Sequence, residues 1–463
     1  MCQAGRVAVS DRFDLVLRQV KLADGRVVDV GVGGGRFADI APRLPISDND
    51  IDGTGKLLIP GLHDHHIHLL ATAARMQSVD LAGLIDPDSI IAALRSRAAE
   101  IAPGEWVRAV GYDERAAGIP DRRLLDMWLP DHPLRLQDRT GALWVLNSAG
   151  LALIGDAPWP AAVETGPNGT PSGRIWRGDD WLRGQIGNQP PSLGVLSRQL
   201  ANWGVTAVTD AGANNGPDEA AILSDAIRSG VLLQKLTLMG REDLPDGTDY
   251  QLGPVKLLFD ERELPELNDI VARIRTARAI GRPVAAHCVT EAELVTYLAA
   301  LAAADGAQKG DRIEHGSLIP SSLIADIAQF KLTVVANPGF IARRGDRYLT
   351  EVDPLDVSNL HRLASLSAHK VALLAGSDAP YGPANPWVAI AAAIHRRTPM
   401  GAIVGADEVL SSDAALSLFT SDASITPVAV ADCCLIAADW TDQVRDDDEP
   451  NPVLATFIGG QLV

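Results

Sequence analysis

The sequence is poor in cysteine. Only four occur in 463 residues, namely Cys2, Cys288, Cys433 and Cys434, and no Cys-x-x-Cys pair is present. Adjacent cysteines such as the last two bridge each other only with strain. These shortages exclude a disulfide framework and a zinc knuckle built on cysteine.

Positive charge and long apolar runs are also scarce. The chain has 41 Lys and Arg against 59 Asp and Glu, a formal net charge of −18. Nucleic acid and anionic membranes would repel such a chain, so we expect a small neutral or cationic substrate and, as protein partner, only further copies in a homo-oligomer. No apolar run is long enough to span a bilayer, and the first residues lack a cationic segment followed by an apolar core. We therefore expect a cytoplasmic protein.

What is present is an ordinary globular composition, with 46% hydrophobic and 22% charged residues. This length predicts one large domain with a smaller satellite. Short strand-like runs separated by Gly and Asp turns occur over residues 13–22, 26–34 and 56–60, and strand-like runs return at 432–439 and 453–463. We predict that residues 1–60 and 425–463 together form a small β-sandwich domain.

From about Gly61 onward, apolar strand runs alternate with amphipathic helical stretches. The clearest helix–strand pairs are 264–281 with 282–289, 290–306 with 311–318, 321–330 with 331–338, and 354–370 with 371–380; an earlier pair is 196–204 with 205–212. This density of pairs is typical of a (β/α)8 barrel. We therefore predict an α/β fold class, with a TIM-type barrel over residues 61–424 as the metal-dependent catalytic domain.

The run PGLHDHHIH contains four histidines. Strand side chains alternate, so His66 and His68 share one face while His63 and His65 share the other. If the even positions turn inward, Asp64, His66 and His68 face the barrel mouth, where barrel active sites form. A lone pair of this kind is equally consistent with surface or satisfied core histidines. We interpret His63 and His65 as supporting or surface residues.

Four later strands each carry a polar residue near the C-terminal end of an apolar run: Lys256, His287, His315 and Asp378. Burying such a group without a metal or a partner costs several kcal/mol. One example means little, but four in order indicate a site. The alternatives are a snorkelling surface lysine for Lys256 and a helix N-cap for Asp378.

On these residues the sequence resembles the amidohydrolase superfamily, particularly its N-substituted formamide deformylase branch. The matching elements are PGLHDHHIH for the PGxxDxHxH signature, the GxxK strand at Lys256, His287, RIEHGS at His315 and GSDAP at Asp378. Flanking stretches such as GEWVRAVGYDE and IDGTGKLLIPGL agree, so the resemblance covers nearly the whole chain. In size the chain is also similar to hydrolases that cleave phenylurea and thiocarbamate herbicides, including molinate.

The resemblance implies a binuclear metal centre. It implies His66, His68 and Asp378 on one ion, His287 and His315 on the other, and Lys256 as a bridging N6-carboxylated lysine. Imidazoles and a carboxylate suit zinc, cobalt, manganese or iron. The ions would lower the pKa of a bound water, and Asp378 would act as the catalytic proton acceptor. We therefore expect hydrolysis of an amide-type C–N bond or a thiocarbamate C–S bond in a small neutral substrate.

The chain departs from the branch at two places. Ala142 stands where a histidine is usual, and the stretch after His287 reads Cys-Val-Thr-Glu instead of the usual xxGD. A polar contact is therefore missing and the substrate pocket is rebuilt. Our candidates for substrate contacts lie near strand ends or in barrel loops: Trp144, Asn147, Trp176, Arg177, Asn337, Phe340 and Tyr381. The alternatives are core aromatics for Trp144 and Trp176 and a solvated ion pair for Arg177.

Two other functions remain open. One keeps the fold with a single metal, as in deaminases or isomerases of the same superfamily, and Lys256 discriminates it from the binuclear enzyme. The other is a barrel that has lost its chemistry and serves only for binding. The complete set of candidate ligands argues against this second alternative.

Overall fold

The computed structural model describes residues 13–47, 49–155, 158–186, 190–259, 261, 264–420, 423–446 and 449–463. This part of the chain divides into two compact units: unit 1, up to residue 69 and from residue 193 onward, and unit 2, residues 70–192. Cys2 lies outside the described residues, while Cys288, Cys433 and Cys434 are buried free thiols.

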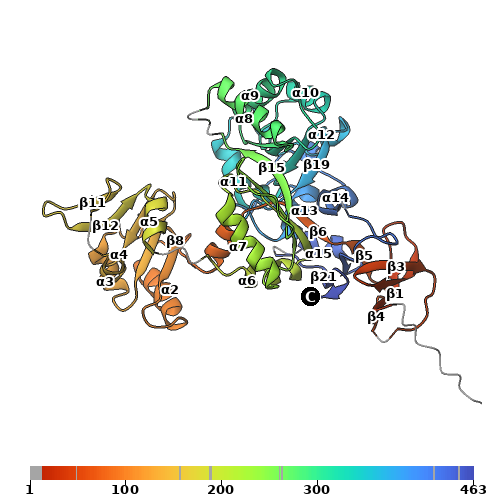
Figure 1. The fold of residues 1–463 in the computed structure, drawn as a ribbon, viewed down its shortest axis with the longest axis horizontal. Coiled ribbons are helices and arrows are strands. Elements are labelled where there is room, and N and C mark those ends of the chain that lie inside the picture. Colours follow the sequence, from red (N-terminus) through yellow and green to blue (C-terminus); the bar gives the residue numbers. More distant parts are fainter. Residues whose placement is uncertain are drawn as a thin grey trace, which may run out of the picture. The chain divides into compact units, whose positions relative to one another are not determined.

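Unit 1 contains an eight-stranded parallel sheet (Figure 1). Its strands, in sheet order, are β19 (Ala372–Ala375), β18 (Thr333–Ala336), β17 (Arg312–His315), β16 (Val284–Cys288), β15 (Gln251–Leu257), β14 (Lys235–Gly240), β13 (Val205–Asp210) and β6 (Leu62–Ile67). Beyond β19, the Asp378 amide donates to the His66 carbonyl at 2.7 Å, and the His68 amide donates to the Ala379 carbonyl at 2.9 Å. These bonds join the two ends of the sheet, so the sheet is a nearly closed barrel.

Helices alternate with these strands as predicted. The helices of unit 1 are α6 (Gly194–Asn202), α7 (Pro217–Arg228), α8 (Leu267–Ala279), α9 (Glu291–Ala303), α10 (Ile324–Gln329), α11 (Gly339–Glu351), α12 (Ala364–Ala368), α13 (Pro386–His395), α14 (Ser412–Thr420) and α15 (Trp440–Asp446), with short 3-10 turns η2 (Ser321–Leu323), η3 (Val357–Asn359) and η4 (Ala406–Glu408). The helix predicted over 354–370 is divided into η3 and α12. Across the described ranges, every helix is too short or too polar to cross a membrane.

The main core of unit 1 lies between the outward faces of β15–β17 and helices α8–α10. Ile274 and Leu301 are fully buried there against Val255 and Ile313. Helix α9 begins with a capping box in which Thr290 accepts from the Glu293 amide and Glu293 accepts from the Thr290 amide. The outward faces are thus filled by apolar side chains, which leaves polar groups on these strands to face inward.

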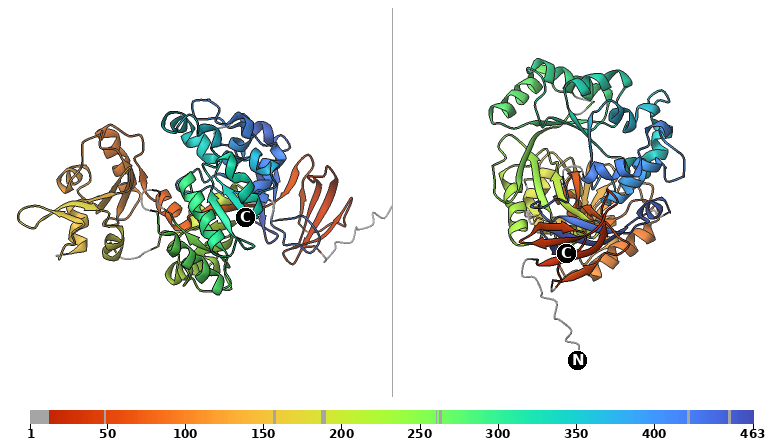
Figure 2. Two further views of the ribbon diagram at one scale, coloured as in Figure 1. Left: turned by 90° about the horizontal axis from the view of Figure 1, so that it is seen from above. Right: turned by 90° about the vertical axis from the view of Figure 1, so that its right-hand side faces the viewer.

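The N- and C-terminal strands share one further sheet of unit 1. Its strands are β1 (Leu15–Lys21), β2 (Val27–Gly33), β3 (Arg36–Ala41), β4 (Asp50–Asp52), β5 (Leu57–Pro60), β20 (Cys433–Ile436), β21 (Val453–Ile458) and β22 (Gln461–Leu462). Strand β5 pairs antiparallel with β20, so the red and blue ends of the chain meet in Figure 2. This confirms that the tail rejoins the N-terminal strands; its arrangement as a two-layer sandwich stays a prediction.

Unit 2 is a separate α/β unit inserted after β6. Its mixed sheet contains β11 (Val163–Thr165), β12 (Pro171–Trp176), β10 (Leu143–Leu146), β9 (Leu134–Asp138), β8 (Val107–Tyr112) and β7 (Val79–Asp80) in that order. Its helices are α2 (Pro87–Ala99), α3 (Arg122–Trp128), α4 (Ser148–Ile154) and α5 (Asp179–Ile186), and α1 (Leu69–Met76) begins at its boundary. The sequence did not separate this unit from the barrel, because its strands and helices alternate in the same way.

Candidate metal centre

Three predicted ligands converge at the seam between β6 and the segment that follows β19. The Nε2 atoms of His66 and His68 lie 3.4 Å and 3.2 Å from Oδ1 of Asp378. One ligand atom from each of the three residues lies within 4.8 Å of the others, a spacing that could hold a metal ion. The prediction that these residues face inward together thus agrees with the geometry.

The seam is close because of two local features. A Cβ on Gly376 would lie 2.4 Å from the backbone nitrogen of His66, so only glycine allows this approach. Oδ1 of buried Asp64 accepts from the amides of His66 and Ser377, at 3.1 Å and 2.9 Å, and links the two strands. Asp378 itself has a φ of 52°, in the left-handed region that few non-glycine residues adopt.

The imidazole of His66 is oriented by a residue that the sequence analysis did not select. Its Nδ1 forms a short hydrogen bond with Oε2 of Glu314, a fully buried carboxylate on β17. Arg312, two residues earlier, donates to both oxygens of Glu314 and, through Nη2, to the His65 carbonyl at 2.7 Å. With Nδ1 engaged in this way, Nε2 is the ring nitrogen of His66 that points toward Asp378.

His315, at the end of β17, is oriented by Asn337. Its Nδ1 lies 2.8 Å from Oδ1 of Asn337, and Nδ2 of Asn337 donates to the Gly376 carbonyl at 2.8 Å. The second bond fixes the amide, so Oδ1 is the acceptor and Nε2 of His315 is left as a lone pair. The His315 ring centroid lies 4.6 Å from the rings of both His66 and His287. The two further predicted ligands therefore adjoin the first group.

Lys256 is not the surface lysine of the alternative interpretation. It lies on β15, is 3% exposed, and its Nζ has no hydrogen-bond partner among the described residues. The nearest opposite charge is Oε2 of Glu314 at 3.9 Å. The helix-cap alternative for Asp378 also fails, since the next helix, α13, is capped by Asn385.

Burial and charge set the protonation of this group. Burial and, after it, the charge of Lys256 lower the pKa of His287 to about 4. Burial and the neighbouring His66 hold the pKa of His315 well below its usual value. Burial also lowers the pKa of Lys256, against the attraction of Glu314. Burial opposes ionisation of Asp378, but the adjacent imidazoles of His66 and His68 hold its pKa well below the usual range. His287 and His315 are therefore neutral beside the ionised carboxylate of Asp378. Burial lowers the pKa of His66, but Glu314 and Asp378 outweigh it and raise that pKa above its usual value.

These residues fit a divalent metal. Nε2 of His66 and Nζ of Lys256 are buried without a partner among the described residues, which is costly unless something else binds them. Neutral imidazole nitrogens and a carboxylate are ligands that zinc, cobalt, manganese and iron accept. Glu314 and Asn337 complete the arrangement, because metal-binding histidines usually donate their other ring N–H to an acceptor.

The three substrate candidates of unit 1 occupy different settings. Both polar ends of Asn337 are engaged, and it is 1% exposed, so the structure gives it a positioning role instead of a substrate contact. The Tyr381 ring is 56% exposed and lies 5.6 Å from the His68 ring. Phe340 is buried, with the Arg344 guanidinium 4.6 Å above its ring. Of these, Tyr381 remains the best placed for a substrate.

The four candidates of unit 2 include one clear correction. Asn147 is fully buried and caps α4: its Oδ1 accepts from the Leu134 and Gly150 amides, and its Nδ2 donates to two carbonyls. Its side chain is therefore structural. Trp144 is 5% exposed in the core of unit 2, as the alternative interpretation held. Trp176 is 43% exposed at the end of β12, and Arg177 follows it with a φ of 49°.

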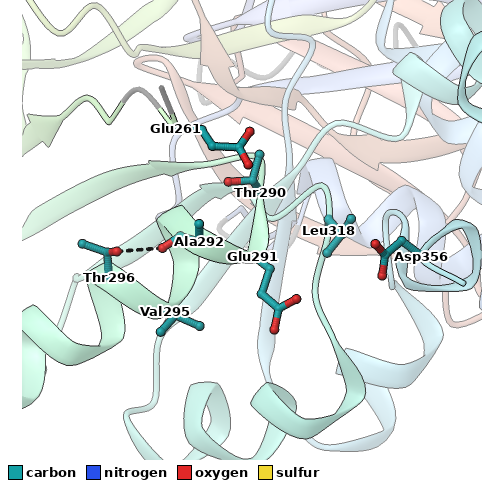
Figure 3. A pocket seen from close by; sticks show the side chains of 8 residues that line it. All are labelled: Glu261, Thr290, Glu291, Ala292, Val295, Thr296, Leu318 and Asp356. Atoms are coloured by element: carbon teal, nitrogen blue, oxygen red, sulfur yellow. Dashed lines mark hydrogen bonds between the residues drawn. The ribbon is translucent and has the colours of Figure 1, made fainter. Parts of the chain in front are cut away.

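A pocket of about 670 Å³ is lined by the first turns of helix α9 and by segments that follow β15 and β17 (Figure 3). Its size suits a small molecule. The lining residues are Glu261, Thr290, Glu291, Ala292, Val295, Thr296, Leu318 and Asp356. None of the predicted ligands or substrate contacts lines it, but Thr290 and Glu291 belong to the stretch that departs from the formamide deformylase pattern. Its three carboxylates disfavour an anionic substrate.

Arg312 and Glu314 were not selected in the sequence analysis, although they are polar residues in an apolar strand, the same pattern that identified the candidate ligands. Arg312 and Glu314 alternate on β17, with fully buried Ile313 facing the other way. A charged pair at i and i+2 in an apolar strand predicts an inward-facing ion pair. Asp64 was noticed as inward-facing, but its function as a link between strands depends on Ser377, which is 313 residues away.

Comparisons with known proteins agree with this geometry. The profile of the amidohydrolase family matches residues 50–424. The chain is 23% identical to N-substituted formamide deformylase of Arthrobacter pascens, over 98% of this chain and 96% of that protein. A metal-dependent hydrolase of Pyrococcus horikoshii has a similar fold, with a TM-score of 0.75 at 19% identity over 94% of this chain and 99% of that one. Molinate hydrolase shares the fold at a TM-score of 0.54 and 12% identity, over 97% and 94% of the two chains.

Proposed function

Because the chain belongs to the amidohydrolase family and is a metal-dependent amidohydrolase, we propose that it hydrolyses an amide-type C–N bond or a thiocarbamate C–S bond. The proposed substrates are small and neutral: an N-substituted amide, a formamide, a phenylurea or a (thio)carbamate. The observation that carries the proposal is the convergence of His66, His68 and Asp378 beside the buried Nζ of Lys256, which has no hydrogen-bond partner among the described residues. The full-length similarity to a formamide deformylase supports the class of bond.

In the proposed site, His66, His68 and Asp378 hold one divalent ion and His287 and His315 hold a second. Such ions supply an electrophile that polarises the substrate carbonyl and activates water. Asp378 is ionised and within 3.4 Å of both histidines, so its carboxylate can accept a proton from water and return it to the leaving nitrogen or sulfur. Burial excludes bulk water from this transfer.

Lys256 has a separate function in this proposal. Its buried Nζ has a lowered pKa, so part of it is a neutral amine that can attack CO₂ and release a proton. The resulting anionic carbamate would bridge the two ions. The change replaces a buried ammonium, which repels cations, with a ligand that binds them.

The alternative is a deaminase or isomerase with a single metal. One observation favours it: among the described residues, one group, His66, His68 and Asp378, has the spacing of a metal site. In this alternative Lys256 stays an ammonium beside Glu314.

Elemental analysis combined with a hydrolysis screen tests the proposal. The screen covers N-formyl, N-acyl, phenylurea and thiocarbamate compounds with the metal-loaded full chain. We expect two ions per chain and turnover of at least one class. Failure on the whole panel with two ions bound would reject the proposed bond classes.

The variant Lys256→Ala separates the two alternatives. We expect bound metal to fall toward one ion per chain and turnover to be nearly abolished. Full metal content and a normal rate in this variant would show that Lys256 does not bridge. The cytoplasmic location and the homo-oligomer stay part of the proposal, and native mass measurement of the purified chain tests the second.

A further inference from the structure

The two candidate metal positions differ in what orients their histidines. Nδ1 of His66 is hydrogen-bonded to the carboxylate of Glu314, and Nδ1 of His315 is hydrogen-bonded to the neutral amide of Asn337. Both acceptors are buried, with exposed fractions of 0% and 1%. The contrast is therefore one of charge and not of exposure.

Glu314 is held firmly in its position. Arg312 donates Nε to Oε1 and Nη2 to Oε2, the second at 3.0 Å, while Nη2 also reaches the His65 carbonyl on β6. Both oxygens of Glu314 accept from the same Arg312 guanidinium, which is the arrangement of a carboxylate in a two-point ion pair. His66 thus donates to a fixed negative charge.

Asn337 is equally fixed but carries no charge. Its Nδ2 is used by the Gly376 carbonyl, so only Oδ1 is available to His315. The nearest carboxylate oxygen to Nδ1 of His315 belongs to Asp378, at 3.8 Å, which exceeds hydrogen-bond distance. Asp378 is itself a candidate ligand of the other position.

An imidazole that donates to a carboxylate is a more basic ligand than one that donates to an amide, because the charge stabilises the electron density shifted to the metal. We propose that the two metal positions have unequal affinities, set by Glu314 and Asn337 as positioning residues. The position of His66, His68 and Asp378 fills first and retains its ion, and that of His287 and His315 fills second. This inference rests on the binuclear centre of the proposed function.

Titration of the metal-free full chain with Co²⁺, followed by absorbance and calorimetry, tests the order. We expect two steps, with the tighter one lost in His68→Ala and the weaker one lost in His287→Ala. Glu314→Gln should weaken the tighter step about 10- to 100-fold, the usual effect of removing such a supporting acceptor. Asn337→Asp should tighten the weaker step about tenfold.

The matched control is Glu408→Gln. Glu408 is also a buried carboxylate of unit 1 that faces an arginine, Arg362 at 3.4 Å, but it touches none of the candidate ligands. It should leave both steps unchanged. Asn337→Asp keeps the test valid if Glu314→Gln fails to fold, since it adds a charge without removing the partner of Arg312.

The outcomes distinguish the two proposals. Two steps of equal affinity, or an unchanged tighter step in Glu314→Gln, would overturn the inference and leave the binuclear hydrolase intact. A reversed assignment by His68→Ala and His287→Ala would overturn it as well. A wild-type chain that binds no Co²⁺ would reject both. A single ion weakened by Glu314→Gln would support the function of Glu314 and reject the bridge at Lys256.

Discussion

The barrel centre of unit 1 and the Asn147 cap of unit 2 are both buried polar clusters, yet their hydrogen bonding differs. At Asn147 the side chain satisfies two amides and two carbonyls. At the barrel centre, Nε2 of His66, Oδ2 of Asp64 and Nζ of Lys256 have no partner among the described residues. A satisfied buried group stabilises the fold, while several unsatisfied groups that converge indicate that something else binds there.

The largest effect is expected at Asp378. Asp378→Asn removes the proton acceptor and one ligand but leaves the local shape, so we predict a fall in kcat of about 10²- to 10⁴-fold. Bound metal should also decrease, and the midpoint of chemical unfolding of the metal-free chain should change little. Kinetics on an active substrate, elemental analysis and urea titration measure the three quantities.

Glu408→Gln is the control for this comparison as well, since it removes a buried charge outside the centre and should retain metal and turnover. Asp378→Asn could instead lower the urea midpoint of the metal-free chain and leave the metal content of the loaded chain unchanged. In that case Asp378 would stabilise the fold, as Asn147 does, and the contrast between the barrel centre and the Asn147 cap would be wrong.

The candidate site could be predicted from the sequence because its proposed ligands interrupt apolar strands in order. Lys256 and His287 each lie between buried apolar neighbours on their strands, so their inward direction followed from alternation. His315 follows inward-facing Glu314 at the end of β17 and has a φ of 70°, so its direction did not follow from alternation. Asn337 was selected by the same signal, but its partner, His315, lies on another strand, so its function could not be derived locally. The sequence alone did not show which residues from distant strands bond to each other.

The fold was predictable where local pattern and topology coincide. The strands β16 to β19 and the helices α9 and α10 lie within their predicted ranges, because alternating runs leave few ways to pack a parallel sheet. Helix α11 was not predicted, and the helix predicted over 354–370 is divided into η3 and α12. Unit 2 was not separated, since β8 and β9 pair in parallel and resemble barrel strands locally. Asn147 was mistaken for a substrate contact for the same reason: its four hydrogen bonds reach residues 3 to 18 positions away.

Asn147→Ala should lower stability and leave metal binding unchanged, which is the opposite of the result expected for Asp378→Asn. The substitution leaves buried groups such as the Leu134 amide and the Leu129 carbonyl without a partner and removes a helix cap, at a cost of about 2–4 kcal/mol. We expect an earlier urea transition for unit 2, measured by hydrogen exchange of its strands. Metal content per folded chain should be unchanged. A variant with normal stability and altered substrate affinity would restore the prediction that Asn147 contacts substrate.

His361 is a buried histidine outside the barrel centre, and it tests whether unpartnered ring nitrogens alone indicate a metal site. It is 1% exposed, and both ring nitrogens lack a partner among the described residues, as at the barrel centre. However, its neighbours are the rings of Phe340 and Tyr348, at 6.4 Å and 5.8 Å, and the carbonyl of His361 accepts from buried Arg396 at 2.9 Å. With aromatic rings and a cation around it, this histidine has no second ligand among the residues that the structure describes and should bind no metal.

The smallest predicted effect is the pH dependence of stability that His361 causes. Burial, and then Arg396, lower the pKa of His361 to about 3, below the value of about 6.5 in an unfolded chain. Between these values the unfolded state takes up a proton that the folded state does not, so stability is complete above pH 6.5 and is lost as pH falls. From pH 7 to 5 the loss from this group is about 2 kcal/mol. His361→Leu should reduce the acid shift of the urea midpoint by this amount, with unchanged Co²⁺ binding at pH 7. An acid shift equal to that of the wild type would show that His361 is protonated in the folded chain, and that its unpartnered nitrogens reach a group other than these rings.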